Sequence, residues 1–393
     1  MNAMKADVII VGGGLVGSIL AIGLSQQQVK VTILEKTPPL SPEMTGDGRT
    51  TAVSYGSQQI FNNLGLWSGI AAYAQPIEEI RVFEEGSAWT VDYHHRDIGT
   101  HPMGYIVENS LLRHHLQQNL QNNPLITWIA SADVLSTKRL AGKVAVNLKD
   151  GQTLEALLLV GAEGRHSPTR QQSSITTRSW DYSQTALVVH LYHTKPHNNT
   201  AWEVFMPSGP LAILPMLPCP KTGHHRSGLV WAKPLSHDWQ NLSDEDLAAQ
   251  IQHYFPFDGD LTVCSQKWTY PLSALTTSSY VDHRLALVGD AAHVVHPIAG
   301  QGVNLGWRDA DVLAAHLGKA HQLGLDIGSA TVLDVYNKKR RVDQRSVLWT
   351  TDGINRLFSF DNSILFFLRN SGFALVNNLP PLKRLLMRKA MGV

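Results

Sequence analysis

The 393-residue sequence contains little cysteine, little net charge and no uninterrupted hydrophobic stretch of membrane-spanning length. Its two cysteines, Cys219 and Cys264, are too few for a disulfide framework and lack the spacing of metal ligands, which favours a reducing compartment and predicts no metal site. A formal net charge of +1 excludes a general attraction to nucleic acid. The uncharged residues 8–24 are interrupted by glycines, whereas a bilayer span needs about 20 apolar residues, so we expect no spanning helix.

The glycines in that stretch predict a nucleotide-binding turn. A short apolar strand is followed by the motif GGGLVG, an apolar helix and a second strand that ends at Glu35. Gly12 permits the tight turn, Gly14 lets the backbone approach a pyrophosphate, and Gly17 lets helix and strand pack closely. Glu35 is placed to accept hydrogen bonds from ribose hydroxyls. This motif predicts a dinucleotide and does not by itself separate NAD from FAD.

Further along the chain, the pattern alternates between helical and strand-like sequence. Helices are predicted over residues 48–67, closing at Gly65, and over residues 109–120. Short β-type runs begin near residue 78, and Asp150-Gly151 predicts a hairpin turn within residues 144–160. Residues 185–271 are mostly strand-like, residues 284–288 form a final buried strand, and helical sequence follows.

This order predicts an α/β fold in which a Rossmann-type nucleotide-binding domain carries an inserted β-rich substrate domain and C-terminal helices. With 43% hydrophobic residues the chain can bury a large core. The nucleotide-binding domain is expected to comprise residues 1–75, 99–180 and 276–393, and the β-sheet substrate domain residues 76–98 and 181–275.

A second glycine cluster, near residue 290, also follows a predicted strand and comes before a predicted helix. The strand over residues 284–288 leads into Gly289 and Asp290, so the carboxylate is expected at the carboxyl end of a strand, where ligands bind in open α/β sheets. Residues 297–302 form a loop, and a helix is expected to start near Gln301. Its free N–H groups would favour an electron-rich ligand such as a reduced flavin ring, by about 0.3 to 1 kcal/mol.

Three motifs in this order resemble those of the class A flavin monooxygenases of the para-hydroxybenzoate hydroxylase fold. They are GGGLVG with Glu35, GAEGRHSPTR from residue 161, and GDAAHVVHPIAGQGVNLGWRD from residue 289. The segments GRTTAVSYGSQQIFNNLGLW, TDGINRLFS and LPPLKRLLMRKAMG are similar to one branch, the hydroxylases of ubiquinone biosynthesis. The resemblance extends over nearly all of the chain.

The resemblance implies an FAD-dependent hydroxylase of the aromatic ring of a polyprenylated phenol. In that family NAD(P)H reduces the flavin, O2 adds to give a C4a-hydroperoxide, and one oxygen is transferred to the ring, while the protein binds, orients and excludes water. The nucleotide-binding domain would then be an FAD-binding domain. The resemblance implies FAD contacts for Gly12, Gly14, Gly17, Glu35, Arg49, Asn109, Gly289, Asp290, Gly300, Gly302 and Asn304.

Two positions depart from the family pattern. Glu163 stands where the family usually has Asp, which lengthens the carboxylate arm of the middle motif by one methylene. Asn109 occupies a position where many relatives carry Arg. The changes bear on the nicotinamide contacts more than on FAD binding.

Candidate catalytic residues lie in the second cluster. We assign His296, Pro297 and Gln301 to the loop that would face flavin and substrate, and we nominate no general base, because an electrophilic oxygen donor does not require one for a phenol. His293 and His296 are three residues apart, but no cysteine or carboxylate pattern accompanies them, so a structural or flavin-side role is favoured over metal binding. Asp309 is expected to cap a helix or pair with neighbouring Arg308.

The C-terminal segment LPPLKRLLMRKAM combines leucines with basic residues. Two interpretations remain open: contact with a membrane surface, or a last helix packed on the nucleotide-binding domain. We expect a cytoplasmic protein, with peripheral attachment to the inner face of the membrane, or contact with a biosynthetic complex, under the first interpretation. The expected small-molecule partners are a prenylated phenol, O2 and NAD(P)H.

Two other functions are compatible with these motifs. One is an FAD monooxygenase of another aromatic or isoprenoid compound. The other is a non-catalytic prenyl-binding module, since the same architecture occurs in escort proteins for prenylated GTPases. The intact Gly289-Asp290 and GQG segments disfavour the binding module, because these segments serve a flavin ring.

Overall fold

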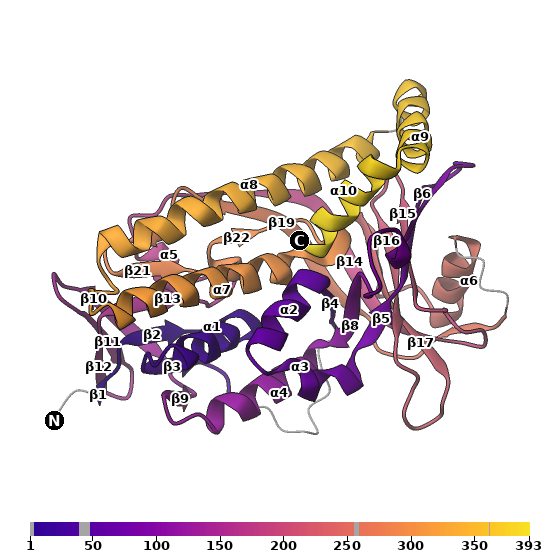
Figure 1. Ribbon diagram of the computed structural model, residues 1–393. Coiled ribbons are helices and arrows are strands. Elements are labelled where there is room, and N and C mark those ends of the chain that lie inside the picture. The colour runs from indigo at the N-terminus through magenta and orange to yellow at the C-terminus, as the bar shows by residue number, and fades with distance from the viewer. Residues whose placement is uncertain (1–3, 39–47, 255–258, 361) are drawn as a thin grey trace.

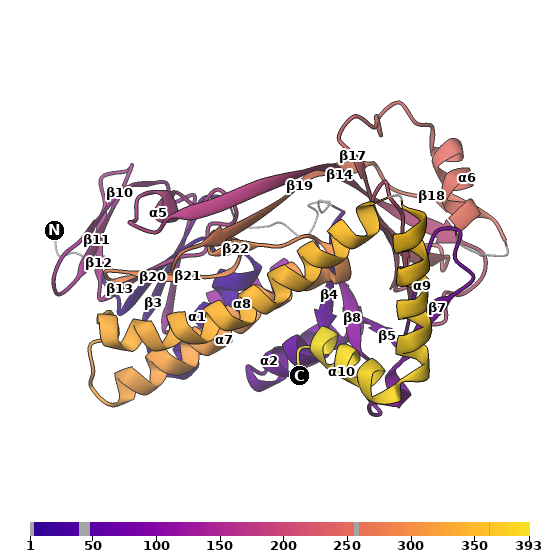
Figure 2. The same cartoon turned by 90° about the horizontal axis from the view of Figure 1, so that it is seen from above.

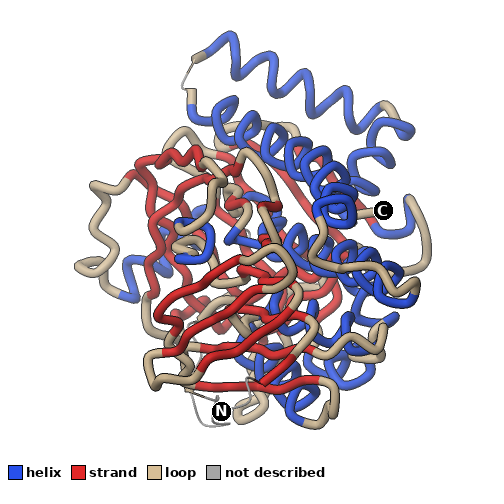
Figure 3. The backbone as a smooth tube through the Cα atoms, turned by 90° about the vertical axis from the view of Figure 1, so that its left-hand side faces the viewer, coloured by secondary structure: helices blue, strands red, loops and turns tan. Residues whose placement is uncertain are grey.

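The computed structural model describes residues 4–38, 48–254, 259–360 and 362–393. It is elongated, with one end built around a parallel sheet and the other around a large, mostly antiparallel sheet, and long helices run along both (Figure 1). The tube view in Figure 3 shows most of the helices gathered on one side of the strands. The α/β fold class predicted from the sequence is confirmed.

The parallel sheet forms because its central strands are short, apolar and buried on both faces. Its spatial order is β20 (Val281–Asp282), β21 (Leu285–Leu287), β13 (Leu158–Gly161), β2 (Val8–Val11), β3 (Val31–Glu35) and β9 (Ile126–Ala130). All neighbours pair in parallel except β20, which is antiparallel to β21. The strand–helix–strand order around the first glycine motif is therefore as predicted.

Helices α1 and α7 lie beside the parallel sheet, α8 runs along the length of the molecule, and α6 lies at the far end beside the large sheet (Figures 1 and 2). Helix α1 packs against both α4 and α7, so segments almost 300 residues apart in the sequence meet beside the sheet. The helix bounds are α1 (Leu15–Gln26), α2 (Tyr55–Asn63), α3 (Trp67–Ile70), α4 (Asn109–Gln121), α5 (Pro168–Gln171), α6 (Asp244–Tyr254), α7 (Gln301–Gln322), α8 (Ala330–Ser359), α9 (Ser363–Asn378) and α10 (Pro380–Met391).

The second large sheet, here called the antiparallel sheet, is antiparallel except where β15 pairs in parallel with β6, and it has its own apolar core, in which Trp231 and Trp239 pack together. Its strands lie in the order β22 (His293–Val294), β19 (Trp268–Thr277), β14 (Thr177–His193), β17 (His225–Pro234), β16 (Leu211–Met216), β15 (Thr200–Phe205), β6 (Glu79–Glu84) and β7 (Thr90–His94). A ninth strand, β18 (Leu261–Val263), also pairs with β14.

Two long strands join the two ends of the molecule. β14 and β19 pair over their length, with one irregularity between Asp181 and Gln184, where Ser183 has φ +54°. The predicted domain boundaries at 180/181 and 275/276 both fall inside these strands. The division into two domains therefore stays a prediction.

Two smaller sheets complete the fold. One has the order β1 (Met4–Lys5), β12 (Thr153–Ala156), β11 (Val144–Leu148) and β10 (Val134–Arg139), and the other the order β4 (Thr50–Ser54), β8 (Gly104–Glu108) and β5 (Gln75–Ile77). The hairpin predicted at Asp150-Gly151 is confirmed as the β11–β12 turn, in which Gly151 adopts φ +88°.

The structure corrects the sequence interpretation in two places. Residues 48–67 are not one helix: Thr50–Ser54 is a strand paired with β8, and the helix begins at Tyr55, after Ser54, whose side chain accepts a hydrogen bond from the Ser57 N–H. That N-cap marks the start of a helix which apolar spacing alone extended too far. In the β-rich segment, helix α6 (Asp244–Tyr254) was not predicted, although its first turn carries three acidic residues.

Candidate functional site

The first glycine turn lies between β2 and α1. Gly12 has φ +100°, and a Cβ there would lie 2.5 Å from the Ala162 carbonyl oxygen, so only glycine fits. A Cβ at Gly17 would lie 2.0 Å from the Gly12 carbonyl oxygen, because helix and turn are in direct contact. At Gly14, by contrast, a Cβ would meet no atom of the described residues within 4 Å, and no side chain among them caps the helix that follows. The turn therefore presents backbone N–H groups at an open position, as anion binding requires.

Glu35 ends β3 beside this turn, as predicted. The Gly13 N–H donates to its Oε2 at 2.6 Å. The Thr37 N–H and hydroxyl donate to its Oε1 at 2.9 and 2.7 Å. The carboxylate is thus held at the edge of the glycine turn by backbone and hydroxyl donors.

The second glycine turn packs directly on the first. A Cβ at Gly289, which has φ +60°, would lie 3.1 Å from Val16 Cγ2, and a Cβ at Gly306 would lie 2.7 Å from the same atom. The indole N–H of Trp307 donates to the Leu15 carbonyl oxygen at 3.0 Å. The two clusters, distant in sequence, therefore form one continuous backbone surface at the carboxyl ends of β2 and β21.

The middle motif, GAEGRHSPTR from residue 161, contacts the backbone next to both glycine turns. The Ala162 N–H donates to the Val11 carbonyl oxygen at 2.8 Å, which continues the β13–β2 pairing into the first turn. The guanidinium of Arg170 donates to the Ala291 carbonyl oxygen at 2.9 Å, just beyond the second turn, and to the Arg165 carbonyl oxygen at 2.7 Å. Arg170 was not singled out from the sequence as a structural link.

Glu163 directs its carboxylate into its own motif. The Thr169 hydroxyl and N–H donate to Oε1 at 2.9 and 3.3 Å, and the Ser167 hydroxyl donates to Oε2. Burial raises the pKa of Glu163, and these donors act in the opposite direction. The carboxylate at this position therefore stabilises the turn that precedes α5.

Asp290 lies at the carboxyl end of β21 with its side chain accessible to solvent. Within the part of the chain that the structure describes, no hydrogen bond or ion pair engages its carboxylate. Desolvation by the surrounding protein raises the pKa of Asp290, while the charges of His293, Arg165 and Arg49 oppose that rise. An unpartnered acceptor beside two arginines and two uncapped helix ends is suited to a ligand that carries both hydroxyl and phosphate groups.

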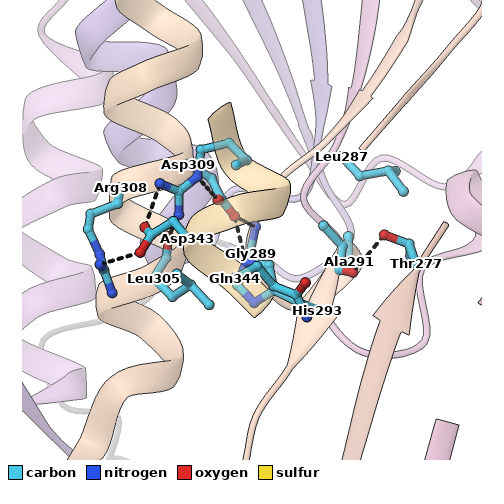
Figure 4. A network of polar contacts seen from close by, with 12 residues as sticks. Thr277, Leu287, Gly289, Ala291, His293, Leu305, Arg308, Asp309, Asp343 and Gln344 are labelled. Carbon is cyan, nitrogen blue, oxygen red and sulfur yellow. Dashed lines mark hydrogen bonds and ion pairs between the residues drawn. The ribbon is translucent and has the colours of Figure 1, made fainter. Parts of the chain in front are cut away.

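A buried network holds the second turn in place (Figure 4). The Asp309 carboxylate, on α7, accepts from the Gly289 N–H at 2.9 Å and is 2.7 Å from His293 Nε2. Its other oxygen accepts from Arg340 Nε at 2.6 Å, and Arg340 also donates to Asp343 at 2.7 Å. Burial opposes the charge of Asp309, but His293 and Arg340 outweigh it and hold the pKa of that carboxyl below its usual value.

The prediction that Asp309 pairs with Arg308 is wrong. Arg308 donates instead to Asp343 at 3.0 Å, because it lies on another face of α7. Asp309 shares the buried face with Leu305 and Leu313, four residues away on either side. That spacing was the available signal, since a carboxylate on an apolar helix face needs buried partners.

The loop that follows contains the candidate catalytic residues. His296 is fully buried, its Nε2 lies 3.4 Å from the Gln184 side-chain oxygen, and its ring meets the Tyr182 ring edge-on at 4.8 Å. Burial lowers the pKa of His296 to about 4, so its imidazole is neutral near pH 7. Pro297 is exposed, whereas the Gln301 side-chain amide donates to the Ala390 carbonyl oxygen of α10 at 3.1 Å.

Helix α7 begins at this loop, and no side chain in the described part of the structure caps it. Gly300 adopts φ +59° at the N-cap, and a Cβ at Gly302 would meet only Val295, at 3.9 Å. Asn304 is buried and accepts from the Ser54 N–H at 3.0 Å while donating to the carbonyl oxygens of Ala52 and Gly300 at 2.7 and 2.8 Å. Asn304 therefore joins β4 to the loop through its side chain.

Asn109 and Arg49 lie together on the β4–β8 side. The Thr51 hydroxyl donates to the Asn109 side-chain oxygen at 2.5 Å, and the Asn109 N–H donates to the Arg49 carbonyl oxygen at 3.0 Å. The Arg49 guanidinium lies 5.3 Å from the centre of the Tyr270 ring. Asn109 thus positions the backbone that carries Arg49.

The two histidines of the second cluster lie on different elements: His293 is in β22 and His296 is in the loop beyond it. His293 faces Asp309 and His296 faces Gln184, so they do not converge on one point. Among the described residues, no group of three or more His, Cys, Asp or Glu side chains could hold a metal ion.

Comparison with protein families matches residues 5–350 to the FAD binding domain family. The chain is 41% identical over 391 residues to ubiquinone hydroxylase UbiL of Rhodospirillum rubrum, covering 98% of this chain and 90% of that relative. It is 31% identical over 398 residues to 3-demethoxyubiquinol 3-hydroxylase of Escherichia coli, and the alignment covers both chains completely.

Solved structures share the fold at low sequence identity. p-Nitrophenol 4-monooxygenase PnpA of Pseudomonas putida superimposes with a TM-score of 0.80 at 18% identity, covering 100% of this chain and 99% of that one. This likeness concerns the arrangement of helices and strands, which matches over the whole length.

Proposed function

The chain belongs to the FAD binding domain family, and on that premise we propose that it is an FAD-dependent monooxygenase that hydroxylates the aromatic ring of a polyprenylated phenol in ubiquinone biosynthesis. The Rhodospirillum rubrum and Escherichia coli relatives, which match nearly the whole chain, carry names of ubiquinone-pathway hydroxylases. The single structural observation that supports the proposal best is the contact between the two glycine turns, with Asp290 beside them and unpartnered among the described residues.

The residues present fit FAD. The open position at Gly14 and the uncapped start of α1 suit the diphosphate, and Glu35 lies where the adenosine ribose would be. Asp290 would accept from the ribityl hydroxyls, and the uncapped start of α7, at Gly300 and the residues after it, would face the flavin ring. Arg49 would contribute positive charge near the diphosphate. These assignments remain proposals for each residue.

When bound, FAD would supply the activation of O2, from which the aromatic ring would receive one oxygen atom while the other leaves as water. The chain's own residues bind, orient and keep water out. The neutral, buried His296 can accept or donate one hydrogen bond without adding charge beside the ring, and the Asp309 network fixes the backbone from which Asp290 projects. Pro297 and Gln301 would act as parts of the same loop, Gln301 by fixing it to α10.

We further propose that NAD(P)H supplies the electrons and that the antiparallel sheet contributes the phenol site. The parallel-sheet end would then serve as the FAD-binding domain and the antiparallel-sheet end as the substrate domain. The N-terminus of α7 lies between these two ends, close to β22 of the larger sheet (Figure 1). That position would let one loop face both cofactor and substrate.

We also propose peripheral contact with the cytoplasmic face of the membrane. Among described residues, no helix is both long and apolar enough to cross a bilayer. Helix α9 nevertheless exposes Ile364, Phe367 and Leu375 with 72%, 70% and 54% of their surface accessible. Neighbouring α10 exposes the basic residues Arg384, Arg388 and Lys389. Apolar and basic side chains on adjacent helices suit a surface of anionic lipid.

The packing of α10 bears on both interpretations of the C-terminal segment, membrane-surface contact and packing on the protein. Met387 and Met391 are buried against residues of α2, β5 and β8, and Lys383 pairs with Asp97 at 2.8 Å. One face of α10 is therefore packed on the protein, while Leu385 on another face is 55% exposed. Packing and surface contact are compatible on the two faces of this helix.

The proposal is tested by purifying the protein and measuring its flavin absorbance and its NAD(P)H oxidation with and without a prenylphenol. We expect bound FAD, oxidation that depends on the prenylphenol, and a product with one added oxygen by mass spectrometry. Asp290→Ala should lose FAD with an unchanged circular dichroism spectrum, whereas the surface control Asp334→Ala should keep it. A colourless wild-type protein that binds prenylphenols would favour the non-catalytic binding module.

A further inference from the structure

An open apolar cavity lies under α9, away from the glycine turns. Its volume is about 400 Å³, within the range of small-molecule pockets. Its walls come from β6, β7 and β15 on one side and from α8, α9 and α10 on the other, and every lining side chain is hydrocarbon except Tyr93 and Arg369. Figure 2 shows α9 crossing beyond the end of α8, beside β7, with α10 turning back from it.

The charge of Arg369 is paired with that of Glu84. Its guanidinium donates to Glu84 at 2.8 Å and to the Leu357 carbonyl oxygen at 2.9 Å, so the ion pair joins α9 to β6 and to the last turns of α8. Further along α9, the Asn377 amide donates to the Thr90 carbonyl oxygen of β7 at 2.5 Å. Polar contacts therefore hold α9 in place, while the apolar side chains between them line an unfilled volume.

The inner end of the cavity reaches the proposed catalytic loop. Phe205 and Phe358 line the cavity and stack with ring centres 4.2 Å apart. Both belong to one buried cluster with Ile298, which lies two residues beyond His296. An apolar path thus runs from the loop to the cavity through side chains in contact.

The outer end of the cavity reaches the exposed apolar face of α9. Leu368 and Leu386 line the cavity and are 56% and 38% exposed, so the space opens at the junction of α9 and α10. Beside that opening lie Ile364 and Phe367, which face solvent. A helix with apolar side chains on both its inner and outer faces is unusual in water.

We propose that this cavity binds the isoprenoid tail of the phenol substrate, with the ring toward the loop that contains His296 and the tail leaving between α9 and α10. The inference rests on the proposed function, because it takes the substrate class from there. The occupant suits the site: a flexible hydrocarbon chain needs volume and apolar walls but no hydrogen-bonding partners. An opening beside exposed apolar and basic residues would let the tail pass from the lipid surface without crossing water.

Gly372 gives a direct test. It lines the cavity on α9, and a Cβ there would meet no atom within 4 Å, so Gly372→Leu fills the space without a backbone clash. Gly353, on α8, is the matched control, because it too has open space around a Cβ but does not line the cavity. Both changes replace a helical glycine by leucine and gain helix propensity alike.

The measurement is titration calorimetry on the FAD-loaded full chain with a phenol carrying two isoprene units and with the same phenol carrying a methyl group. Gly372→Leu should weaken binding of the prenylphenol about tenfold and leave the methylphenol unchanged, while Gly353→Leu changes neither. Equal affinity of wild type for the two phenols, or of Gly372→Leu and wild type for the prenylphenol, would overturn the proposal.

A second variant covers the case in which Gly372→Leu does not fold. Leu368→Asp places a charge at the exposed rim and should weaken only the prenylphenol, whereas Leu325→Asp, exposed elsewhere, should not. These binding results are independent of turnover. If Gly372→Leu weakens prenylphenol binding but the wild type hydroxylates nothing, the proposed function is wrong and the cavity assignment stands.

Discussion

The second glycine turn and the cavity under α9 represent opposite ways of building a site. At the turn, buried charges are fully paired, and Asp309 joins Gly289, His293 and Arg340 within hydrogen-bond distance. At the cavity, one ion pair secures the helix, and apart from Tyr93 the rest of the described lining is hydrocarbon. The first arrangement fixes a backbone position, and the second leaves a volume with few directional constraints.

The difference follows from what each end would bind. A cofactor has one shape and many polar groups, so hydrogen-bonding geometry must be exact to within a few tenths of an ångström. A hydrocarbon tail has many conformations and no polar groups, so area and volume decide its binding. Mutations should therefore act on folding and geometry at the turn, and on affinity at the cavity.

The largest effect is expected for Asp309→Ala. The change leaves Arg340 and the Gly289 N–H buried without their partner, which should cost about 3 to 5 kcal/mol of unfolding free energy. Urea denaturation measures it. Asp334→Ala, which removes a surface pair, should cost less than about 1 kcal/mol. A loss of similar size in both variants would remove the contrast between the buried turn and ordinary surface.

The unfolding free energy should depend on pH through the protonation of His296. Burial lowers its pKa to about 4 in the folded protein, against about 6.5 in an unfolded chain, so between these values the unfolded state binds a proton that the folded state does not. This contribution is present in full above pH 6.5 and is lost as the pH falls toward 4, to a total of about 3 kcal/mol.

His296→Gln keeps a polar side chain and removes this titration. Its unfolding free energy should fall less than that of the wild type between pH 7 and pH 4.5, measured by denaturation at matched FAD. Identical slopes for the two proteins would mean that His296 is solvated or charged in the folded state.

A smaller loss is expected for Asn304→Ala. It leaves the Ser54 N–H and two carbonyl oxygens without their side-chain partner, at about 1 to 3 kcal/mol. Because the side chain joins β4 to the loop, FAD affinity should fall as well. Flavin fluorescence on dilution measures that affinity, and an unchanged value would confine Asn304 to stability.

The smallest effect on stability is expected for Phe367→Ser combined with Ile364→Ser. The same double change should have a large effect on binding to lipid vesicles. Both side chains are exposed, so the unfolding free energy should change by less than about 0.5 kcal/mol each. Co-sedimentation with phosphatidylglycerol vesicles should decrease, whereas the exposed control Leu325→Ser should sediment like wild type. Undiminished sedimentation of the double variant would remove α9 from the membrane proposal.

Local signals predicted much of the cofactor end. The glycine motif, the apolar strands around it and the acidic residue at the end of β3 all depend on neighbours in sequence, and they lie where their spacing placed them. The partners of Asp309 could not be found this way, because His293, Arg340 and Gly289 come from three different elements. The cavity was beyond reach for the same reason: it exists only where α8, α9 and the antiparallel sheet meet.

The β14–β19 ladder has a mechanical consequence. It spans both ends of the molecule without a hinge loop. The two ends therefore cannot rotate apart unless several backbone hydrogen bonds between β14 and β19 break. The one point at which the ladder can flex is its irregularity near Ser183, and the adjacent Tyr182 rests edge-on against the imidazole of His296. A bend of the large sheet would therefore displace that ring, and strain at the distant end would reach the loop through Tyr182 and Gln184, two side chains of β14 that contact His296.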